Sequence, residues 1–367
     1  MNNTCIRPDL LDFDPYVAGR SIDEIKTAYG LTQVIKMASN ENPLGVSPHV
    51  QDVLARNASL VFRYPQAGNP LLRDALSHYL GVPGDCLVCG NGSDEIIDLL
   101  IRVLVQPGKD NVVAFDPCFS MYKVQAKLCG VTFRQVPLNR DFSFPWKKLL
   151  GIMDHRTKLV FITNPDNPSG HAVPAKEIVE VAATIPSGAT LVVDEAYIEF
   201  ADPVARYSMV GLWEATQNIV LLRTFSKCFG LAGLRLGYGI MPPTLADYLM
   251  RTRPPFSVNI LAEKAGIAAL HDKDFIEATR TTVLTGKDQL TQGMEALGCH
   301  VYPSQANFLL VKPPMAPDVL CDALLRKGII IRPLANYGLH DSVRVSVGTT
   351  QENRIFLQTF EECIHES

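Results

Sequence analysis

Short apolar runs alternate with helical or loop segments through the middle of the chain, between about residues 112 and 241. Several of these runs are almost continuously apolar, which is typical of strands buried on both faces of an α/β sheet. Five segments have this pattern, and we expect each to be a strand: 112–115, 159–163, 191–193, 219–222 and 236–240. The pattern predicts a large α/β domain with a mainly parallel sheet sandwiched between helices.

The final third of the chain has a different pattern. Long stretches with helical periodicity precede short strand-like runs. The helical stretches are about 260–271 and 275–297, and the strand-like runs are 307–311, 329–332 and 343–347. Thr349 and Glu352 have the spacing of a capping box, which predicts the start of a last helix.

The chain has 367 residues, which exceeds the size at which a single hydrophobic core stops growing, so we expect two domains. Pairs of prolines at 242–243 and 254–255 separate the two patterns. We expect a large cofactor-binding domain over residues 36–255. Residues 1–35 and 256–367 would form an N-terminal arm and a smaller α+β C-terminal domain.

Composition excludes several classes of function. With 47% hydrophobic and 20% charged residues, the chain is an ordinary globular protein, and its net charge of −4 argues against nucleic acid or an anionic membrane as a partner. No apolar stretch approaches the roughly 20 residues of a membrane span, and the N-terminus lacks the apolar core of a signal peptide. We therefore expect a cytoplasmic protein.

Nine cysteines, an odd number spread along the chain, argue against a disulfide framework. Cys86 and Cys89 form a lone C-x-x-C, which we interpret as part of a short strand and not as a metal or redox site. We expect no metal.

Lys227 is the most informative residue, because it follows a strand that we expect to be buried. A lysine held out of water has a lowered pKa and becomes a nucleophile towards aldehydes. Thr224 and Ser226 precede it and Arg235 follows it, and these groups could hold a phosphate dianion. The combination indicates pyridoxal phosphate.

A second motif is Gly90-Asn91-Gly92-Ser93-Asp94-Glu95. It opens a helix whose polar side chains form one narrow stripe, so Gly92 and Ser93 mark a helix N-terminus that favours a phosphate. A dinucleotide fingerprint fits poorly, because Glu95 stands where the third glycine belongs. Taken alone, a plain helix cap remains an alternative.

Two further motifs follow predicted strands. Asn167 lies in the loop 164–170, which is either a plain turn or a ligand-binding loop at the carboxyl end of a strand. Asp194 ends the strand 191–193, where a carboxylate needs a partner, such as the pyridine nitrogen of the cofactor or the start of the next helix. Asn167 and Tyr197 could both donate to the phenolic oxygen of the cofactor. Asp194, Lys227 and Arg235 follow one another along the chain, each at the end of a predicted strand. This order favours interpreting the motifs together as one pyridoxal-phosphate site.

With these motifs the chain resembles the class I/II aminotransferases of fold type I, and among them the histidinol-phosphate aminotransferase family. The likeness extends nearly from end to end. Its motifs are 16–20, 38–45, 63–65, 90–95, 164–170, 194–197 and 224–235, with Arg332 and Arg344. The chain departs from the family at Cys228, where Ser, Ala or Gly is usual. Cysteine is also small, so we expect altered packing and not lost chemistry.

The resemblance implies roles for individual residues around pyridoxal phosphate. Lys227 would bind the cofactor covalently and later move a proton, and Asp194 would pair with the pyridine nitrogen. Asn167 and Tyr197 would hold the ring oxygen, while Phe119 would stack on the ring. The phosphate would be held by Gly92, Ser93, Asp94, Thr224, Ser226 and Arg235. In the family, the residue matching Tyr64 reaches the cofactor phosphate of the neighbouring subunit, which implies a homodimer.

The same resemblance places the substrate against Tyr16, Asn167, Arg332 and Arg344. Alternation in the strand 343–347 puts Arg344 and Ser346 on the face away from the core. Without the other motifs, both arginines would be read as solvated residues at strand edges. A guanidinium fork accepts either a carboxylate or a phosphate, so the arginines alone do not define the substrate.

The reaction that the resemblance implies is transamination of L-histidinol phosphate with 2-oxoglutarate in histidine biosynthesis, giving imidazole acetol phosphate and glutamate. An aromatic amino-acid aminotransferase shares these features, and so does a lyase such as threonine-phosphate decarboxylase. A non-catalytic binding protein on the same fold is a third alternative.

Overall fold

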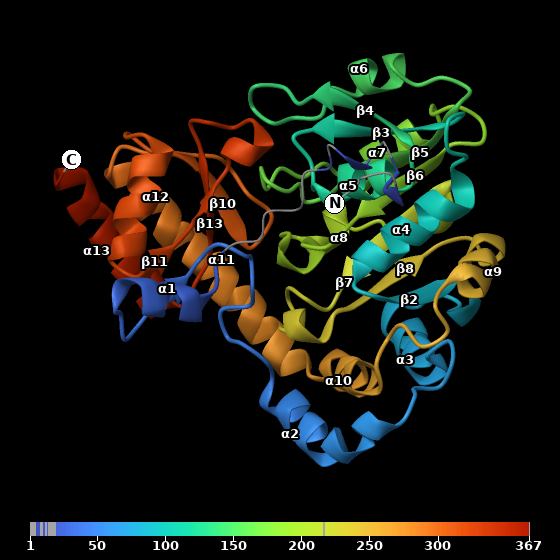
Figure 1. Cartoon of the computed structure of the whole chain (residues 1–367), viewed down its shortest axis with the longest axis horizontal. Coiled ribbons are helices and arrows are strands. Elements are labelled where there is room, and N and C mark those ends of the chain that lie inside the picture. The colour runs from blue at the N-terminus through green and yellow to red at the C-terminus, as the bar shows by residue number, and fades with distance from the viewer. Residues whose placement is uncertain (1–4, 8–9, 12, 14–19, 216, 367) are drawn as a thin grey trace.

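The computed structural model describes residues 5–7, 10–11, 13, 20–215 and 217–366. Within these residues, the largest sheet has seven strands (Figure 1). In sheet order they are β2 (Leu87–Asn91), β8 (Leu236–Ile240), β7 (Ile219–Thr224), β6 (Thr190–Asp194), β5 (Thr157–Thr163), β3 (Asn111–Asp116) and β4 (Thr132–Pro137). Six strands of this described sheet run in one direction and β8 runs in the opposite direction, so the sheet is mainly parallel, as predicted.

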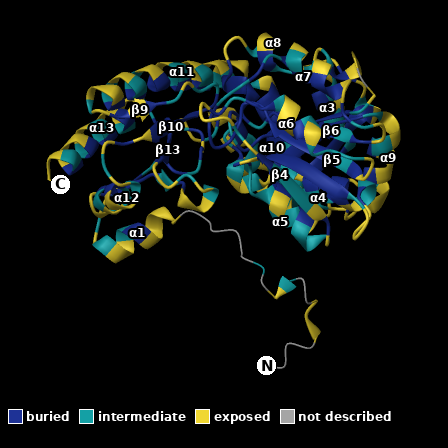
Figure 2. Cartoon of the chain, turned by 90° about the horizontal axis from the view of Figure 1, so that it is seen from above, coloured by how far each residue is buried: buried dark blue, intermediate teal, exposed yellow. Residues whose placement is uncertain are grey.

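The sheet is buried on both faces, which explains the continuous apolar runs. In β3, Val113 and Phe115 face one core, while Val112 and Ala114 face the other. Helices α3 (Pro70–Leu80), α6 (Trp146–Gly151), α7 (Ala175–Ala182) and α10 (Ile260–His271) contribute to the first core. Helices α4 (Ser93–Leu104), α5 (Met121–Leu128) and α9 (Pro243–Thr252) contribute to the second. Figure 2 shows buried strands between helices whose outer sides are exposed. The predicted α/β sandwich is confirmed.

All five predicted strands of this region lie within β3, β5, β6, β7 and β8. Cys89 lies in β2, as the strand interpretation predicted, but Cys86 lies in a 3-10 helix, Gly84–Cys86, just before that strand. The edge strand β4 was not predicted. It is half-exposed and includes Arg134 and Gln135, so it lacks the apolar run that identifies a central strand.

The C-terminal part of the chain forms a separate antiparallel sheet, orange to red in Figure 1. Its order is β12 (Arg332–Pro333), β13 (Val343–Ser346), β10 (Phe308–Lys312) and β9 (His300–Val301). The helices of this part are α11 (Lys273–Ala296), α12 (Pro317–Arg326) and α13 (Thr350–His365). The predicted capping box is present, with Thr349 and Glu352 exchanging both hydrogen bonds at the start of α13.

Residues 22–37 attach to this C-terminal part, whereas Arg7 donates to Leu128 O of α5 at 3.0 Å. Helix α1 (Ile22–Tyr29) leads into β1 (Ile35–Lys36), which pairs in parallel with β11 (Ile329–Ile330). Helix α2 (Pro48–Asn57) follows β1. Elsewhere in the chain, the short helix α8 (Val204–Tyr207) follows β6. Met37 extends the pairing, because its N–H donates to Ile330 O at 2.8 Å and its carbonyl accepts from Ser346 N at 2.8 Å. Residues 38–40 are thereby led from the C-terminal sheet towards the ends of the large sheet.

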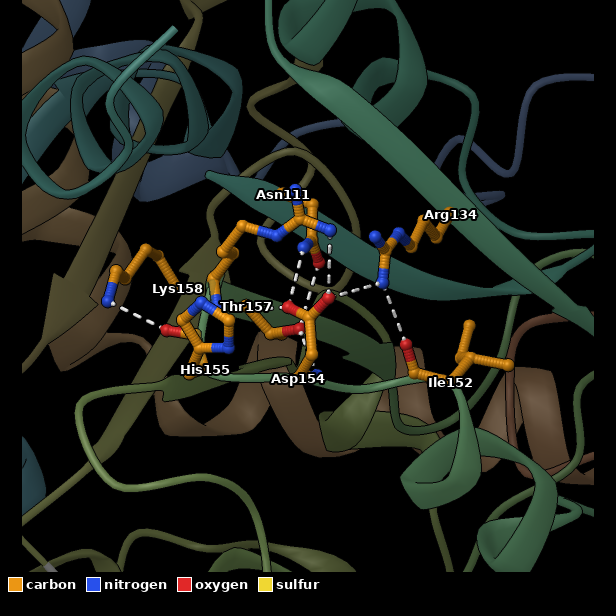
Figure 3. Close-up of polar contacts among 8 residues, drawn as sticks. Asn111, Arg134, Ile152, Asp154, His155, Thr157 and Lys158 are labelled. Atoms are coloured by element: carbon orange, nitrogen blue, oxygen red, sulfur yellow. Dashed lines mark hydrogen bonds and ion pairs between the residues drawn. The ribbon is translucent and has the colours of Figure 1, made fainter. Parts of the chain in front are cut away.

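A polar cluster around Asp154 joins the amino ends of β3 and β5 (Figure 3). It lies at the opposite end of these strands from their carboxyl ends. Its carboxylate accepts hydrogen bonds from Asn111 Nδ2 at 3.1 Å and Arg134 Nη1 at 3.1 Å. Thr157 Oγ1 joins the two strands by donating to Asn111 Oδ1 at 2.8 Å.

All nine cysteines lie among the described residues and are free thiols. The described part of the chain contains no helix that combines the length and the apolarity needed to cross a membrane.

Candidate active site

A cavity of about 250 Å³ opens at the carboxyl ends of the central strands, where α/β sheets bind ligands. Asp194 ends β6, and its register partner Thr163 ends β5, so the two lie side by side. The cavity is lined by Ser39, Glu41, Gly92, Ser93, Asp94, Phe119, Thr163, Asn167, Asp194, Ala196, Tyr197, Thr224, Ser226, Lys227, Ala232 and Arg235. Every residue predicted to contact the cofactor is in this set except Tyr64.

Lys227 presents its amine to this cavity. Nζ donates to Ser39 O at 3.2 Å and lies 5.7 Å from the centre of the Tyr197 ring. Burial, followed by the positive charge of Arg344, lowers the pKa of this amine to about 8; Arg235 acts in the same direction, while Glu41 opposes them. Near neutral pH a useful fraction of the amine is therefore unprotonated, which is the form that attacks a carbonyl carbon.

Asp194 is buried, with 2% of its surface exposed. Burial raises the pKa of its carboxyl to about 7, against hydrogen bonds from the Tyr122 hydroxyl at 2.9 Å and from Ala196 N at 3.1 Å. A carboxyl of this kind ionises readily once a cation comes within hydrogen-bond distance. Sequence reasoning missed Tyr122, because an aromatic residue on a buried helix face is usually only a core residue.

Tyr197 and Asn167 offer hydrogen-bond donors to the same cavity. The Tyr197 oxygen accepts from Asn40 Nδ2 at 3.1 Å, and burial raises the pKa of the phenol to about 12, so the hydroxyl keeps its proton. Asn167 Oδ1 accepts from Arg344 Nη1 at 2.6 Å. This leaves the amide N–H groups of Asn167 as the donors that it can offer to a ligand.

The opposite end of the cavity suits an anion. Gly92, Ser93 and Asp94 line this end of the cavity at the start of α4, where a helix has N–H groups without intrahelical partners. A Cβ on Gly92 would lie 2.7 Å from Arg235 Nη2, so only glycine lets the guanidinium come this close. Arg235 has a left-handed φ of 54°, a strained conformation typical of functional sites, and donates to Asp94 Oδ2 at 3.1 Å.

A second hollow of about 100 Å³ adjoins the first, between the large sheet and the C-terminal sheet. Its lining residues are Ala38, Ser39, Asn40, Phe119, Asn167, Tyr197, Lys227, Arg332, Tyr337 and Arg344. Both predicted substrate arginines are present, because Arg332 on β12 pairs with Arg344 on β13.

The reading of Arg344 as a solvated residue at a strand edge is wrong. Arg344 and Ser346 do lie on the face away from the core, but residues 38–40 cover that face. Arg344 is 7% exposed, and Nη2 donates to Ala38 O at 2.8 Å. Among the described residues, its buried Nε has no hydrogen-bond partner.

The model of the family described as "Aminotransferase class I and II" matches residues 32–360 of the chain. The chain belongs to this family. Curated histidinol-phosphate aminotransferases are similar over nearly the whole length. The protein from Nitratidesulfovibrio vulgaris (strain Hildenborough) is 54% identical over 359 residues, covering 98% of this chain and 96% of that protein. The one from Oleidesulfovibrio alaskensis is 53% identical over 365 residues, covering 98% and 95%.

Solved aminotransferases share the fold. Histidinol-phosphate aminotransferase from Sinorhizobium meliloti, solved in complex with pyridoxal-5'-phosphate, matches with a TM-score of 0.89 and 26% identity. The match covers 99% of this chain and 98% of that one. The resemblance, the fold class and the activity class predicted from the motifs are therefore confirmed.

Two predicted residues are not placed in the cavity of this aminotransferase. Within the described part of the chain, Tyr64 lies apart from it, with 80% of its surface exposed and its ring stacked 4.7 Å from that of Phe256. Tyr16 lies outside the described residues.

Proposed function

We propose that the chain is a pyridoxal-phosphate-dependent aminotransferase that transaminates L-histidinol phosphate with 2-oxoglutarate, giving imidazole acetol phosphate and glutamate in histidine biosynthesis. The observation that carries the proposal is the position of the Lys227 amine, which shares one cavity with the buried acid Asp194 and the anion-binding helix start at Gly92. The 54% identity to a histidinol-phosphate aminotransferase supports the substrate.

The groups that line the cavity match the chemical groups of pyridoxal phosphate. The helix start at Gly92, Ser93 and Asp94, with Thr224, Ser226 and Arg235, would hold the phosphate. Asp194 would pair with the protonated pyridine nitrogen, and Phe119 would cover a ring face. Asn167 and Tyr197 would donate to the ring oxygen. When bound, the cofactor supplies an electron sink for the bonds at the amino carbon of the substrate.

The residues of the chain would do the positioning and the proton transfer. Lys227 would bind the cofactor covalently and, once released by the substrate amine, would move the proton that transamination requires. Its pKa of about 8 suits a base that works near neutral pH. Asp194 would stay ionised against the pyridine nitrogen and keep that nitrogen protonated.

Substrate recognition would depend on Arg332, Arg344, Asn167 and Tyr16. The buried Nε of Arg344 has no hydrogen-bond partner among the described residues, so its fork can take a further acceptor. That acceptor is the phosphate of histidinol phosphate or the carboxylate of the second substrate. An aromatic amino-acid aminotransferase would use the same arginines for a carboxylate, so kinetics must distinguish the two activities.

The decisive experiment compares wild type with Lys227→Ala, both supplied with pyridoxal phosphate. Wild type should develop a visible absorption band and turn over histidinol phosphate with a higher kcat/KM than phenylalanine or tyrosine. Lys227→Ala should lose at least about 10²–10⁴-fold in kcat, the usual contribution of a positioned base. Turnover by Lys227→Ala with the cofactor bound would contradict the mechanism. Release of carbon dioxide from an amino-acid phosphate would favour the lyase instead.

The assembly that we propose is a homodimer in which Tyr64 completes the site of the partner subunit. Tyr64 lies in an exposed apolar segment with Val61 (67% exposed) and Phe62 (74% exposed), which is typical of a surface that another protein covers.

We also propose that the protein is cytoplasmic. The division that we propose is a large domain over 36–255 and a smaller domain built from 1–35 and 256–367.

Complementation tests the shared site. Tyr64→Phe and Lys227→Ala subunits should each form defective homodimers. A mixed dimer contains one intact site if Tyr64 acts across the interface, so an equal mixture should recover about a quarter of wild-type activity. If Tyr64 acts within its own subunit, mixing restores nothing.

A further inference from the structure

Asn40 links the cofactor side of the cavity to the C-terminal sheet. It is 1% exposed and adopts a left-handed φ of 56°. Its side chain lies between Tyr197, which follows β6, and Ser346, at the end of β13. Asn40 Nδ2 lies 3.1 Å from the Tyr197 hydroxyl oxygen, and Asn40 Oδ1 lies 2.8 Å from Ser346 Oγ.

The hydrogen bonds around Asn40 fix which group is the donor and which is the acceptor at each contact. Ser346 Oγ accepts the backbone N–H of Asn40 at 2.9 Å and donates its own proton to Asn40 Oδ1. The amide oxygen therefore faces Ser346, and the amide nitrogen faces Tyr197. An amide nitrogen only donates, so the Tyr197 oxygen is the acceptor and its own proton is directed elsewhere. Tyr197 lines the cavity, which is where that proton can be given.

The backbone of residues 38–40 holds this arrangement in place. Three successive carbonyls each accept a hydrogen bond from a different part of the site: Ala38 O from Arg344 at 2.8 Å, Ser39 O from Lys227 at 3.2 Å, and Asn40 O from Asn307 Nδ2 at 3.1 Å. The strained backbone of Asn40 is thus fixed from both sides, which is the condition for a left-handed residue to persist.

We propose that Asn40 is a positioning residue for the reaction, which holds the Tyr197 hydroxyl as a hydrogen-bond donor to the ring oxygen of the cofactor. The proposal rests on the proposed function, because it takes pyridoxal phosphate as the ligand of the cavity. Ser346 acts one step further away, by fixing which end of the Asn40 amide faces Tyr197. Chains of hydrogen bonds with a single direction strengthen their last donor.

The bound cofactor reports on this donor directly. With the cofactor bound through Lys227, its visible absorption would change with pH, because the Lys227 nitrogen and the ring oxygen would share one proton. A weaker donor at the ring oxygen leaves that oxygen a better acceptor for the shared proton, so the midpoint of the absorption change moves to higher pH. The midpoint can be measured without any turnover.

The experiment compares four holoenzymes: wild type, Asn40→Gly, Tyr197→Phe and the double variant. Glycine accepts the left-handed backbone at position 40, so the variant removes the side chain without adding strain. We expect Asn40→Gly to raise the midpoint by about 0.3–1 pH unit, the size of one net hydrogen bond. Tyr197→Phe should raise it at least as far, and the double variant should match Tyr197→Phe.

Two further variants make the test specific. Ser346→Ala should raise the midpoint in the same direction by a smaller amount. Asn111→Ala removes a buried asparagine at the other end of the sheet, in the Asp154 cluster of Figure 3, and should leave the midpoint unchanged. Thermal unfolding of each cofactor-free variant shows whether it folds.

Each result decides one question. An unchanged midpoint in Asn40→Gly, or an equal rise in the presence and absence of the Tyr197 hydroxyl, overturns the role of Asn40. Failure of wild type to develop the visible band with pyridoxal phosphate overturns the proposed function instead, so the two failures are distinguishable.

Discussion

The hydroxyl of Tyr122 donates a hydrogen bond of 2.9 Å to Asp194 Oδ2 from helix α5, beneath the carboxyl ends of the strands. It also lies 2.8 Å from Thr163 Oγ1, so it joins the ends of β5 and β6. Burial, followed by the charge of Asp194, raises the pKa of Tyr122 well above its usual value, so the phenol stays a donor. The carboxylate that would face the cofactor is thus held from behind by a residue that does not line the cavity.

Tyr122→Phe should weaken cofactor binding in a pH-dependent way. Loss of the donor raises the pKa of Asp194 above its present value of about 7, so less of the carboxyl is ionised at pH 7. We expect the affinity of the cofactor-free protein for pyridoxal phosphate to fall roughly fivefold at pH 7 and much less at pH 9. Absorbance titrations at the two pH values measure this, with Tyr248→Phe on the exposed surface as control. An equal loss at both would mean that Tyr122 contributes only packing.

Asp194 and Asp154 should give opposite pH dependences of stability. The folded pKa of Asp194, about 7, lies above its unfolded value near 3.9. Its contribution is therefore fully present below about pH 4 and is lost as the pH rises through 7, at up to about 1.4 kcal/mol per pH unit. In cofactor-free protein, Asp194→Asn should reduce the fall in unfolding free energy between pH 4 and 7. Urea unfolding across this range is the measurement, and an unchanged slope would contradict the shift.

Asp154 titrates in the other direction. Burial acts to raise its pKa, but hydrogen bonds from Asn111, Arg156 and Arg134 outweigh burial and hold the pKa below its usual value. Figure 3 shows Asn111 and Arg134 pointing towards Asp154. Its contribution is present above the unfolded pKa and is lost as the pH falls towards the folded value. Asp154→Asn should therefore reduce the loss of stability below about pH 4 and leave the range from pH 5 to 7 unchanged. The two variants serve as controls for each other.

A buried ion-pair network supports the strand ends that carry Asp194 and Lys227. Arg223 Nη2 lies 2.7 Å from Glu195 Oε2, and Arg223 Nη1 lies 3.3 Å from Glu199 Oε1, with all three side chains buried. Arg223→Met leaves two buried carboxyl groups without their cation, so we expect a loss of about 3–5 kcal/mol of unfolding free energy. Adding Glu195→Gln should recover part of it.

The control for this network is Arg56→Met. Arg56 pairs with Asp52 at 2.9 Å on an exposed helix face, so its loss should change stability by less than about 1 kcal/mol. Urea unfolding of the cofactor-free variants compares the two. Similar losses at both sites would show that burial does not govern the energy of the Arg223 network.

The sequence predicted those features of the structure that depend on residues close together in the chain. Central strands were recognised because both faces are buried, and Lys227 and Asp194 were recognised because charged groups directly after such strands need a partner. The edge strand β4 was missed because its half-exposed residues, Arg134 and Gln135 among them, form no apolar run.

The remaining parts of the site depend on contacts between residues far apart in the sequence. Asn40 meets Ser346 across 306 positions and Tyr197 across 157. Neither contact leaves a local pattern, so the motif around Asn40 indicated family membership but not its role. Arg344 was placed on the correct strand face, but its burial depends on residues 38–40 covering that face. No periodicity in the strand itself reports this.

Gly237→Ala should damage the anion end of the cavity. A Cβ at this position in β8 would lie 2.4 Å from Ser93 N, 2.7 Å from Gly92 C and 3.1 Å from Arg223 O. All three are backbone atoms that cannot rotate away, so the start of α4 must move. We expect a loss of about 1–3 kcal/mol of stability, the usual cost of overpacking. Affinity for pyridoxal phosphate should fall as well, because the N–H groups of the helix start would no longer converge on the phosphate.

Gly211→Ala is the matched control, because no atom of the described residues lies within 4 Å of a Cβ there, and we expect a change within about 0.5 kcal/mol. The measurements are urea unfolding of the cofactor-free protein and titration with pyridoxal phosphate and with pyridoxal. Displacement of the helix start should weaken binding of the phosphorylated form more than that of pyridoxal. If both forms lose affinity equally, the substitution acts through general unfolding and the helix start is not the phosphate site.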